Sequence, residues 1–469
     1  MSVLQTVSFS MTKDEFFSSF KEQTNEYNKR VFLESGRGGQ ACMATWNPFA
    51  TAYATDNGLA IQWHDGREEF REGEPLDLVE QLVAQYGFHR QSDLPFFQGG
   101  AIGFITYDYA RKIEVLPIDT IDDLHIPDIY FYLFDAWAVL DVHSNQVTLM
   151  KLASSEVDLQ EWKEAWLEAA RDGIEKRLFH AEQAIEVKPD QNELLISFSG
   201  SAFEDAVRKI QEYIAQGDVF QVNLSVRQAK KLNAAPMTMY EAVRSFNPSP
   251  YMAYIESPEF AVVSGSPELL VKRDGTELST RPIAGTRPRG KSEQEDLALA
   301  NELIHHEKER AEHVMLVDLE RNDLGKVSAY GTVEVDEFMV IERYSHVMHI
   351  VSNVRGEVAP GKTNADIIRA MFPGGTITGA PKIRTMEIIE ELEPVRRGLY
   401  TGSIGWIGYT GDMELNIVIR TAFIQDSMAY IQAGAGIVID SIPENEFIES
   451  LNKAKAMWQA KAMAEGVTQ

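Results

Sequence analysis

The sequence has a single cysteine, no long apolar run and too few basic residues to balance its acidic ones. Cys42 stands alone, which excludes an internal disulfide framework and a multi-cysteine metal site. The 44 Lys and Arg against 71 Asp and Glu give a net charge of −27, which disfavours nucleic acid and anionic membranes as partners. No window approaches the ~18 apolar residues of a membrane span, and the N-terminus lacks the pattern of a signal peptide. We therefore expect a soluble, cytoplasmic protein.

The length and composition are those of a large globular protein. The 469 residues, 44% hydrophobic and 25% charged, suit one large or two moderate domains. A polar, proline-containing stretch at 185–193 indicates a boundary. We therefore expect an N-terminal region, 1–190, and a C-terminal region, 191–469.

Two kinds of pattern alternate along the chain. Runs rich in aromatic and β-branched residues at 58–65, 129–142 and 146–152 predict strands, and hairpin-spaced runs continue in the second region. Charged amphipathic runs at 156–184 and 295–319 predict helices. Separate helices beside hairpin-spaced strands predict an α+β fold, in which helices cover antiparallel sheets.

Local signals mark several helix ends. Ser201, followed three residues later by Glu204, has the spacing of a capping box. Gly217 stands where a C-terminal glycine belongs. Pro381 and Pro443 suit the first position of a helix.

Two carboxylate pairs are the first candidates for chemistry. Glu309 and Glu312 stand three residues apart on one predicted helix, and Glu446 and Glu449 do so on another. That spacing puts each pair on one helix face. Two such faces could hold Mg²⁺, which takes oxygen ligands and keeps waters or substrate in its shell. Solvated helix faces explain the same spacing.

Three further features indicate an anion pocket. Glycines within 372–384 free backbone amides ahead of a helix, and the stretch 431–438 has only alanine and glycine where backbone approaches closely. Arg420 stands among β-branched apolar residues, where burial is costly unless it meets an anion. A tight turn explains the glycines within 372–384 equally well, and a structural ion pair explains Arg420 equally well. Together the features predict a pocket for a small polycarboxylate activated by Mg²⁺.

These motifs resemble those of the chorismate-utilising enzymes, which include component I of anthranilate synthase and of aminodeoxychorismate synthase, isochorismate synthase and salicylate synthase. The matching stretches run in order through 200–465 and include FQVNLS, SGSPE, RPIAGTRPRG, ERAEHVMLVDLERNDLGKV, YSHVMHIVS, FPGGTITGAPK, YTGSIGW, AGAGIV and PENEF. FLES at 32–35 and FFQGGAIGFITYDYAR at 96–111 resemble the amine-adding members. The resemblance implies two facing, largely antiparallel β-sheets with helices packed outside, and a Mg²⁺-dependent chorismate site between them.

The resemblance also implies roles for individual residues. Glu312 and Glu449 match direct metal ligands, with Glu309 and Glu446 as nearby or water-bridged partners. Glu268 matches the general acid that assists departure of the C4 hydroxyl, a poor leaving group unless it is protonated. The residues that match contacts to the substrate carboxylates are Thr376, Tyr400, Arg420, Gly434, Gly436 and Lys453.

Three positions bear on the nucleophile and the ring. His349 matches a histidine near the reacting ring whose role differs among members, and a structural role is its alternative. Members that use water resemble one another in having a lysine base where this chain has Gln221, so we expect ammonia as the nucleophile. The sequence has no Cys-His glutaminase signature, which implies a separate glutamine amidotransferase subunit as the ammonia source. Many aminodeoxychorismate synthases resemble each other in having a lysine at position 284, where this chain has Ala284.

These features leave two products open. Ala284 favours amination at C2, as in anthranilate synthases, whereas FFQGGAIGFITYDYAR and FQVNLS favour amination at C4 to 4-amino-4-deoxychorismate. We favour C4, with C2 as the alternative. A non-catalytic subunit that binds chorismate or an amino acid is a more remote alternative.

Part of a tryptophan inhibitor site also matches. The residues that resemble it are Glu34, Ser35, Pro250, Tyr251 and Met252. The stretch 35–48 departs from the Arg-Tyr-Ser run usual after Leu-Glu-Ser. We therefore expect a remnant of this site.

Overall fold

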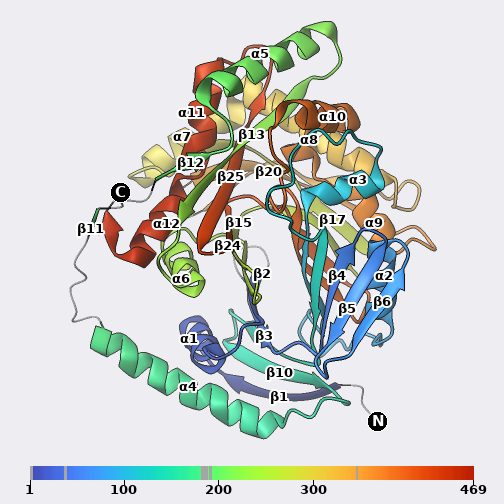
Figure 1. The fold of residues 1–469 in the computed structure, drawn as a ribbon, viewed down its shortest axis with the longest axis vertical. Coiled ribbons are helices and arrows are strands. Elements are labelled where there is room, and N and C mark those ends of the chain that lie inside the picture. Colours follow the sequence, from blue (N-terminus) through green and yellow to red (C-terminus); the bar gives the residue numbers. More distant parts are fainter. Residues whose placement is uncertain (1–3, 36–39, 181–187, 190–192, 345–346, 469) are drawn as a thin grey trace.

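Two twelve-stranded sheets form the frame of the protein in a computed structural model (Figure 1). The structure describes residues 4–35, 40–180, 188–189, 193–344 and 347–468. The boundary predicted after residue 190 falls in 190–192, outside the described residues, so the division into two regions stays a prediction.

The first sheet combines strands from distant parts of the chain. Its order is β1 (Leu4–Ser10), β10 (Gln146–Leu152), β9 (Ala136–Asp141), β3 (Ala41–Trp46), β2 (Arg30–Ser35), β14 (Tyr251–Glu256), β15 (Ala261–Ser266), β24 (Thr421–Gln425), β25 (Met428–Ile437), β13 (Gln221–Lys231) and β12 (Leu195–Ile196), with β21 (Gly379–Ala380) beside β13. Neighbouring strands in this order pair antiparallel.

The second sheet is built in the same way. Its order is β18 (Ile283–Pro288), β20 (Val347–Glu357), β17 (Glu277–Arg281), β16 (Leu269–Asp274), β23 (Met413–Asn416), β22 (Ser403–Gly408), β7 (Gly100–Ile105), β8 (Ile129–Leu133), β4 (Ala50–Thr55), β5 (Gly58–Trp63) and β6 (Glu68–Glu72), with β19 (Glu334–Arg343) beside β20. These pairs are antiparallel too. The short strands β11 (Lys188–Pro189) and β26 (Val467–Thr468) pair with each other in parallel.

Helices lie outside the two sheets (Figure 1). The α-helices are α1 (Lys13–Thr24), α2 (Pro75–Ala84), α3 (Ala110–Ile113), α4 (Leu159–His180), α5 (Gly200–Gln216), α6 (Pro236–Phe246), α7 (Glu293–His305), α8 (Glu307–Gly325), α9 (Asn364–Met371), α10 (Lys382–Leu392), α11 (Pro443–Lys453) and α12 (Lys455–Glu465). Two short 3₁₀ helices are η1 (Tyr107–Tyr109) and η2 (Gly375–Ile377). Within the described residues, no helix has both the length and the apolar character needed to cross a membrane.

The main hydrophobic core lies between the inner faces of the two sheets. Val31 and Val226 of the first sheet belong to one buried cluster with Ile102, Phe104 and Leu415 of the second. Burial of these facing apolar side chains holds the sheets together. The arrangement confirms the predicted fold class.

A second core lies on the other face of the first sheet. Helices α1, α4 and α6 cover it with large side chains that include Phe16, Trp166 and Tyr240. The rings of Phe16 and Trp166 stack with 4.6 Å between their centroids. Helix packing on this side fixes the sheet that supplies β13 and β25 to the pocket described below.

The structure corrects two predicted elements. The strand run 129–142 is two strands, β8 and β9, which belong to different sheets. Both strands are buried, so the apolar run continues where the chain changes sheet, and periodicity alone does not reveal the change. The helix predicted over 295–319 is two helices, because His306 is extended and its ring accepts a hydrogen bond from the Glu309 amide. His306 thereby ends α7 and caps α8.

Helix ends were predicted with mixed success. Gly217 ends α5 in the left-handed region, with φ of 85°, as predicted. The capping residue of α5 is Ser199, however, because its hydroxyl accepts the Ala202 amide, and Ser201 lies inside the helix. Pro443 opens α11 as predicted, whereas Pro381 is the residue before α10. The helix predicted over 156–184 begins at Leu159, and residues 181–184 lie outside the described residues.

Candidate active site

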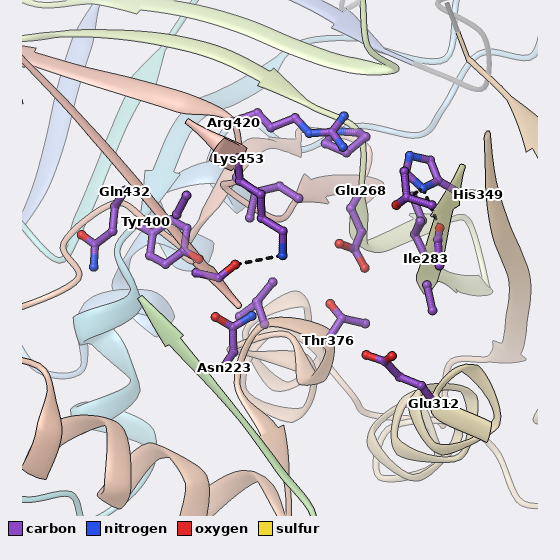
Figure 2. Close-up of a pocket in the computed structure, with 18 of the residues that line it drawn as sticks. Asn223, Glu268, Ile283, Glu312, His349, Thr376, Tyr400, Arg420, Gln432 and Lys453 are labelled. Carbon is purple, nitrogen blue, oxygen red and sulfur yellow. Dashed lines mark hydrogen bonds between the residues drawn. The ribbon is translucent and has the colours of Figure 1, made fainter. Parts of the chain in front are cut away.

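A pocket of about 250 Å³ lies where strands of both sheets meet helices α8 and α11. β18 and β20 supply part of its wall from the second sheet, and β13 and β25 supply part from the first. Nine of the predicted site residues line it: Glu268, Ala284, Glu312, His349, Thr376, Tyr400, Arg420, Gly434 and Lys453. Figure 2 shows the labelled side chains of this group around one opening.

Glu268 lies between β15 and β16 and is 5% exposed. Its Oε1 atom has no hydrogen-bond partner among the described residues. Burial raises the pKa of Glu268 to about 8; the Thr376 hydroxyl opposes the rise and the nearby Glu320 charge adds to it. At neutral pH Glu268 therefore holds a proton that it can donate.

His349 projects from β20 on the same side of the pocket (Figure 2). Its Nδ1 lies 2.9 Å from the Gly285 carbonyl oxygen, so Nδ1 carries the proton and donates it. Burial lowers the pKa of His349 to about 4, and the ring is neutral at pH 7. The buried Nε2 atom lacks a partner among the described residues, and it is an acceptor.

Arg420 lies just before β24 with φ of 51°, an uncommon conformation for a residue other than glycine. Burial lowers the pKa of Arg420, although a guanidinium still stays charged. Glu268 and Tyr344 act on the pKa of Arg420 through their charge alone, without a hydrogen bond. A largely buried guanidinium without a hydrogen-bonded partner in the described part of the chain is suited to binding an anion.

The wall opposite Glu268 is formed by Lys453, Gly434 and Tyr400. The Lys453 ammonium donates to the Gly434 carbonyl over 2.9 Å and also pairs with Glu449 at 2.9 Å. A β-carbon on Gly434 would lie 2.6 Å from the backbone carbonyl oxygen of Leu224, so only glycine fits there. The buried Tyr400 ring packs 5.5 Å from the Arg397 guanidinium.

Gln221 and Gly436 lie behind this wall rather than on its surface. The Gln221 amide donates to Glu312 Oε1 over 3.1 Å. A β-carbon on Gly436 would lie 2.4 Å from Gln221 Nε2. Gly436 therefore makes room for the amide that reaches Glu312.

The four glutamates predicted to hold metal lie on α8 and α11. Glu312 reaches the pocket, Glu309 accepts from Arg287 over 3.3 Å, and Glu449 pairs with Lys453. Burial raises the pKa of Glu446, and the Glu449 charge adds to this effect.

The charge of Lys308, on α8, opposes that rise in the pKa of Glu446, on α11. No group of three or more His, Cys, Asp or Glu close enough to hold a metal is found in the described ranges. The carboxylate oxygens suit Mg²⁺ chemically, and a substrate carboxylate and water would complete its shell.

The predicted remnant of a tryptophan site lies elsewhere, between β2 and β14. Glu34, Tyr251 and Met252 line a cavity of about 20 Å³, which has room for about one water. Ser35 is the last residue of β2, and the buried Pro250 precedes β14.

Asn223, Gln432 and Glu320 are among the residues at or behind the pocket that were absent from the predicted site. Asn223 lines the pocket, with its buried Oδ1 unpartnered among the described residues. Gln432 lines the pocket beyond the Tyr400 ring (Figure 2). Glu320 lies behind the pocket, 3% exposed, and its charge acts on Glu268. Alternation along β13 places Asn223 on the face of Gln221, which could have revealed it.

One pocket thus has a carboxyl that holds its proton, a neutral histidine and a guanidinium without a hydrogen-bonded partner among the described residues, an arrangement suited to an enzyme that acts on a small anion. The family model for chorismate binding enzymes matches residues 28–459. The chain belongs to this family of chorismate-utilising enzymes.

Several relatives are similar over most of their length. Aminodeoxychorismate synthase component 1 of Bacillus subtilis strain 168 is 51% identical over 97% of this chain and 96% of its own. Anthranilate synthase component 1 of Thermus thermophilus is 46% identical over 84% of this chain and 85% of its own.

A solved structure shares the fold. Anthranilate synthase component I from Streptococcus pneumoniae TIGR4 superposes with a TM-score of 0.76 and 34% identity, covering 90% of this chain and 93% of that one.

Proposed function

We propose that the chain aminates chorismate at C4 with ammonia and gives 4-amino-4-deoxychorismate. The observation that carries the proposal is the placement of a proton-holding Glu268 in the same pocket as Arg420, which has no hydrogen-bonded partner among the described residues. Chorismate carries two carboxylates and an allylic C4 hydroxyl, so it needs both an anion contact and an acid. The 51% identity to an aminodeoxychorismate synthase component 1 supports C4 as the position of attack.

In the proposed reaction the C4–O bond breaks and a C4–N bond forms. Glu268 gives its proton to the departing hydroxyl, which leaves as water. Ammonia supplies the electron pair of the new bond, and the resulting ammonium group returns a proton to the Glu268 carboxylate, which balances the charges and restores the acid. The neutral His349 would accept a hydrogen bond at Nε2 within the pocket and so orient the substrate ring or the ammonia.

The substrate carboxylates are held by the cationic side of the pocket. Arg420 offers the paired donors that match a carboxylate, and Lys453 adds a second cation. Thr376, Tyr400 and the amides around Gly434 supply neutral donors.

Mg²⁺ is the proposed cofactor. Glu312 and Glu449 would be its direct ligands, and Glu309 and Glu446 would hold water in its shell. When bound, Mg²⁺ stabilises negative charge on the ring carboxylate of the substrate.

Ammonia would come from a glutamine amidotransferase subunit in the cytoplasm. Cys42 is the one cysteine, it is buried, and burial raises the pKa of its thiol. A protonated, buried thiol cannot attack glutamine. With a single cysteine the chain also needs no oxidising compartment to fold.

Ala284 favours the second candidate, amination at C2 to give anthranilate. Its methyl group lines the pocket on β18 and is 8% exposed, so no amine stands there to attack the ring. Ammonia itself would then approach C2.

Product analysis separates the two candidates. The purified chain is incubated with chorismate, Mg²⁺ and ammonium, with and without aminodeoxychorismate lyase, and products are compared with 4-aminobenzoate and anthranilate standards. We expect 4-aminobenzoate only when lyase is present, and nothing from glutamine alone. Anthranilate without 4-aminobenzoate would reverse the choice of carbon, and no consumption of chorismate would refute both candidates.

A further inference from the structure

A buried ion pair lies directly behind the wall of the pocket. Arg397, in the segment between α10 and β22, is 3% exposed. Its Nη2 donates to Oε1 of Glu393 over 2.7 Å, and its Nε donates to Oε2 of the same carboxylate over 3.0 Å. Neither Arg397 nor Glu393 lines the pocket. The pair therefore supports the wall from behind and does not contact what the pocket holds.

The Arg397 guanidinium contacts three residues that do line the pocket. Nη2 donates to the Asn223 carbonyl oxygen of β13 over 2.6 Å, and Nη1 donates to the Ile377 carbonyl oxygen of η2 over 3.1 Å. The guanidinium also lies over the Tyr400 ring, 5.5 Å from its centroid. Nη1 donates to the Thr401 hydroxyl as well, over 3.3 Å, so each of the five N–H groups of Arg397 has an acceptor.

Glu393 extends the same network to a fourth lining residue. Its Oε1 accepts from the Ser225 amide over 2.8 Å and from the Ser225 hydroxyl over 2.7 Å. Because that hydroxyl has a single proton, its oxygen accepts from the side-chain amide of Gln432, 2.9 Å away on β25. Asn223, Tyr400 and Gln432 lie on one side of the opening in Figure 2. The ion pair thus joins separate segments of the chain that form this side of the pocket.

The shape of the arginine side chain matters for this network. A guanidinium presents five donors in a rigid plane, whereas a lysine ammonium presents three donors on one nitrogen. The acceptors of Arg397 come from β13, η2 and the segment before β22, so a point charge cannot hold all of them at a fixed spacing. Such support is what keeps a site in its productive geometry.

We propose that Arg397 is a positioning residue for this site: its guanidinium, locked by Glu393, fixes the spacing between Asn223, Ile377 and Tyr400 and so sets how well the pocket fits chorismate. The proposal deepens the function proposed above and rests on chorismate as the ligand of the pocket. It holds whichever carbon is aminated.

Chorismate binding and turnover test the proposal. Arg397→Lys keeps the charge but loses the planar donors, so kcat/KM should fall by roughly 100-fold, the effect of misplacing reacting groups by about 1 Å. Calorimetric titration should show part of this loss as a higher Kd for chorismate. Folded Arg397→Lys with the Kd and kcat/KM of the wild-type chain would overturn the proposal, whereas a wild-type chain that binds no chorismate would refute the proposed function instead.

Arg30→Lys is the matched control. Arg30 is also buried, pairs with Glu256, donates to the Thr24 carbonyl and lies over the Tyr254 ring, but it does not line the pocket. Both lysine variants should have a lower Tm. Only Arg397→Lys should change the Kd of chorismate at a temperature well below both midpoints. An equal change in Arg30→Lys would show a general loss of stability and would also overturn the proposal.

Amide hydrogen exchange is a second readout, and it needs no substrate. The Asn223 amide donates to the Thr378 carbonyl over 2.8 Å, which joins β13 to the loop that follows η2. Arg397→Lys should therefore exchange faster than the wild-type chain in 221–225 and 376–380. Wild-type exchange rates in both segments of the folded variant would overturn the proposal, even if the chain binds no chorismate.

Two variants complete the exchange experiment. Arg30→Lys should leave 221–225 and 376–380 at wild-type rates. Ser225→Ala removes the hydroxyl that links Glu393 to Gln432, so it should speed exchange in the same segments by less than Arg397→Lys. It serves as the test if Arg397→Lys does not fold, and wild-type exchange in Ser225→Ala would then overturn the proposal.

Discussion

The side-chain amide of Gln221 donates a hydrogen bond to the carboxylate of Glu312, with 3.1 Å between Nε2 and Oε1. The contact joins β13 of the first sheet to α8, which packs on the second. It links Gln221, which stands where water-using relatives are expected to have a lysine base, to Glu312, which matches a metal ligand. Gln221 therefore orients Glu312, besides lacking the basicity to activate water.

Loss of this contact should weaken the response to Mg²⁺. We expect Gln221→Ala to lower the apparent Mg²⁺ affinity by roughly 10-fold, the lower end of the effect of removing an outer hydrogen-bond partner of a ligand. Calorimetric titration of Mg²⁺ in the presence of chorismate measures it directly. Gln62→Ala changes an exposed glutamine on β5 that does not line the pocket, and it is the control. Unchanged Mg²⁺ affinity in Gln221→Ala would show that Glu312 needs no such support.

The carboxylates on α11 provide a test of the metal itself. We expect Glu449→Gln to lower activity by at least ~100-fold at limiting Mg²⁺, because one of the charges proposed to hold the cation is lost. Glu444→Gln changes an exposed carboxylate at the start of the same helix and should have little effect. Near-normal turnover of Glu449→Gln at limiting Mg²⁺ would remove Glu449 from the proposed metal site.

Protonation of Glu268 should set the upper pH limit of activity. The pKa of this carboxyl is raised by burial to about 8, and the proton donor is the protonated form, so the rate should fall as pH rises through about 8. We expect Glu268→Gln to lose roughly 10²–10⁴-fold of the rate, the usual effect of general acid catalysis, together with this limb. Glu414→Gln is the control, because Glu414 is another buried carboxyl with a pKa raised to about 7 by burial but does not line this pocket. A high-pH limb that survives in Glu268→Gln would belong to another group.

The ion pairs of Glu34 should matter for stability. Glu34 is 2% exposed, pairs with Lys13, and accepts from Arg244 over 2.6 Å. Glu34→Ala leaves the Arg244 charge without this partner and should lower the free energy of unfolding by about 3–5 kcal/mol. Glu241→Ala breaks a more exposed pair with Lys21 and should cost about 1 kcal/mol or less. Equal urea midpoints for the two variants would contradict the difference in burial.

The fold could be predicted from sequence in its class but not in its pairing. Strand runs and helix signals indicated separate helices beside antiparallel strands, and the structure has them. No local signal, however, indicates that β2, at 30–35, pairs with β14, at 251–256, because that contact depends on packing of the whole chain. The split of 129–142 into two strands was hidden because the apolar run continues where the chain changes sheet.

The structure brings several of the motif residues named from the sequence to one pocket, while their roles stay predictions. Glu268, His349 and Arg420 all line it. Glu320 could not be found in this way, since a charge on a helix is exposed in most proteins. It is buried here only because α8 packs against β17 and η2.

Ala284 leads to the last prediction. It lies on β18, opposite Ile350 of β20, and lines the pocket beside His349. Ala284→Lys would place an amine against the bound ring. Because a nearly buried lysine favours its neutral, nucleophilic form, we expect a covalent adduct with the substrate, visible as added mass on the intact protein. Ala284→Met fills the same space without an amine and should lose activity with no added mass. If both variants lose activity equally and neither gains mass, Ala284 acts by providing space for ammonia, and an amine at this position cannot reach the ring.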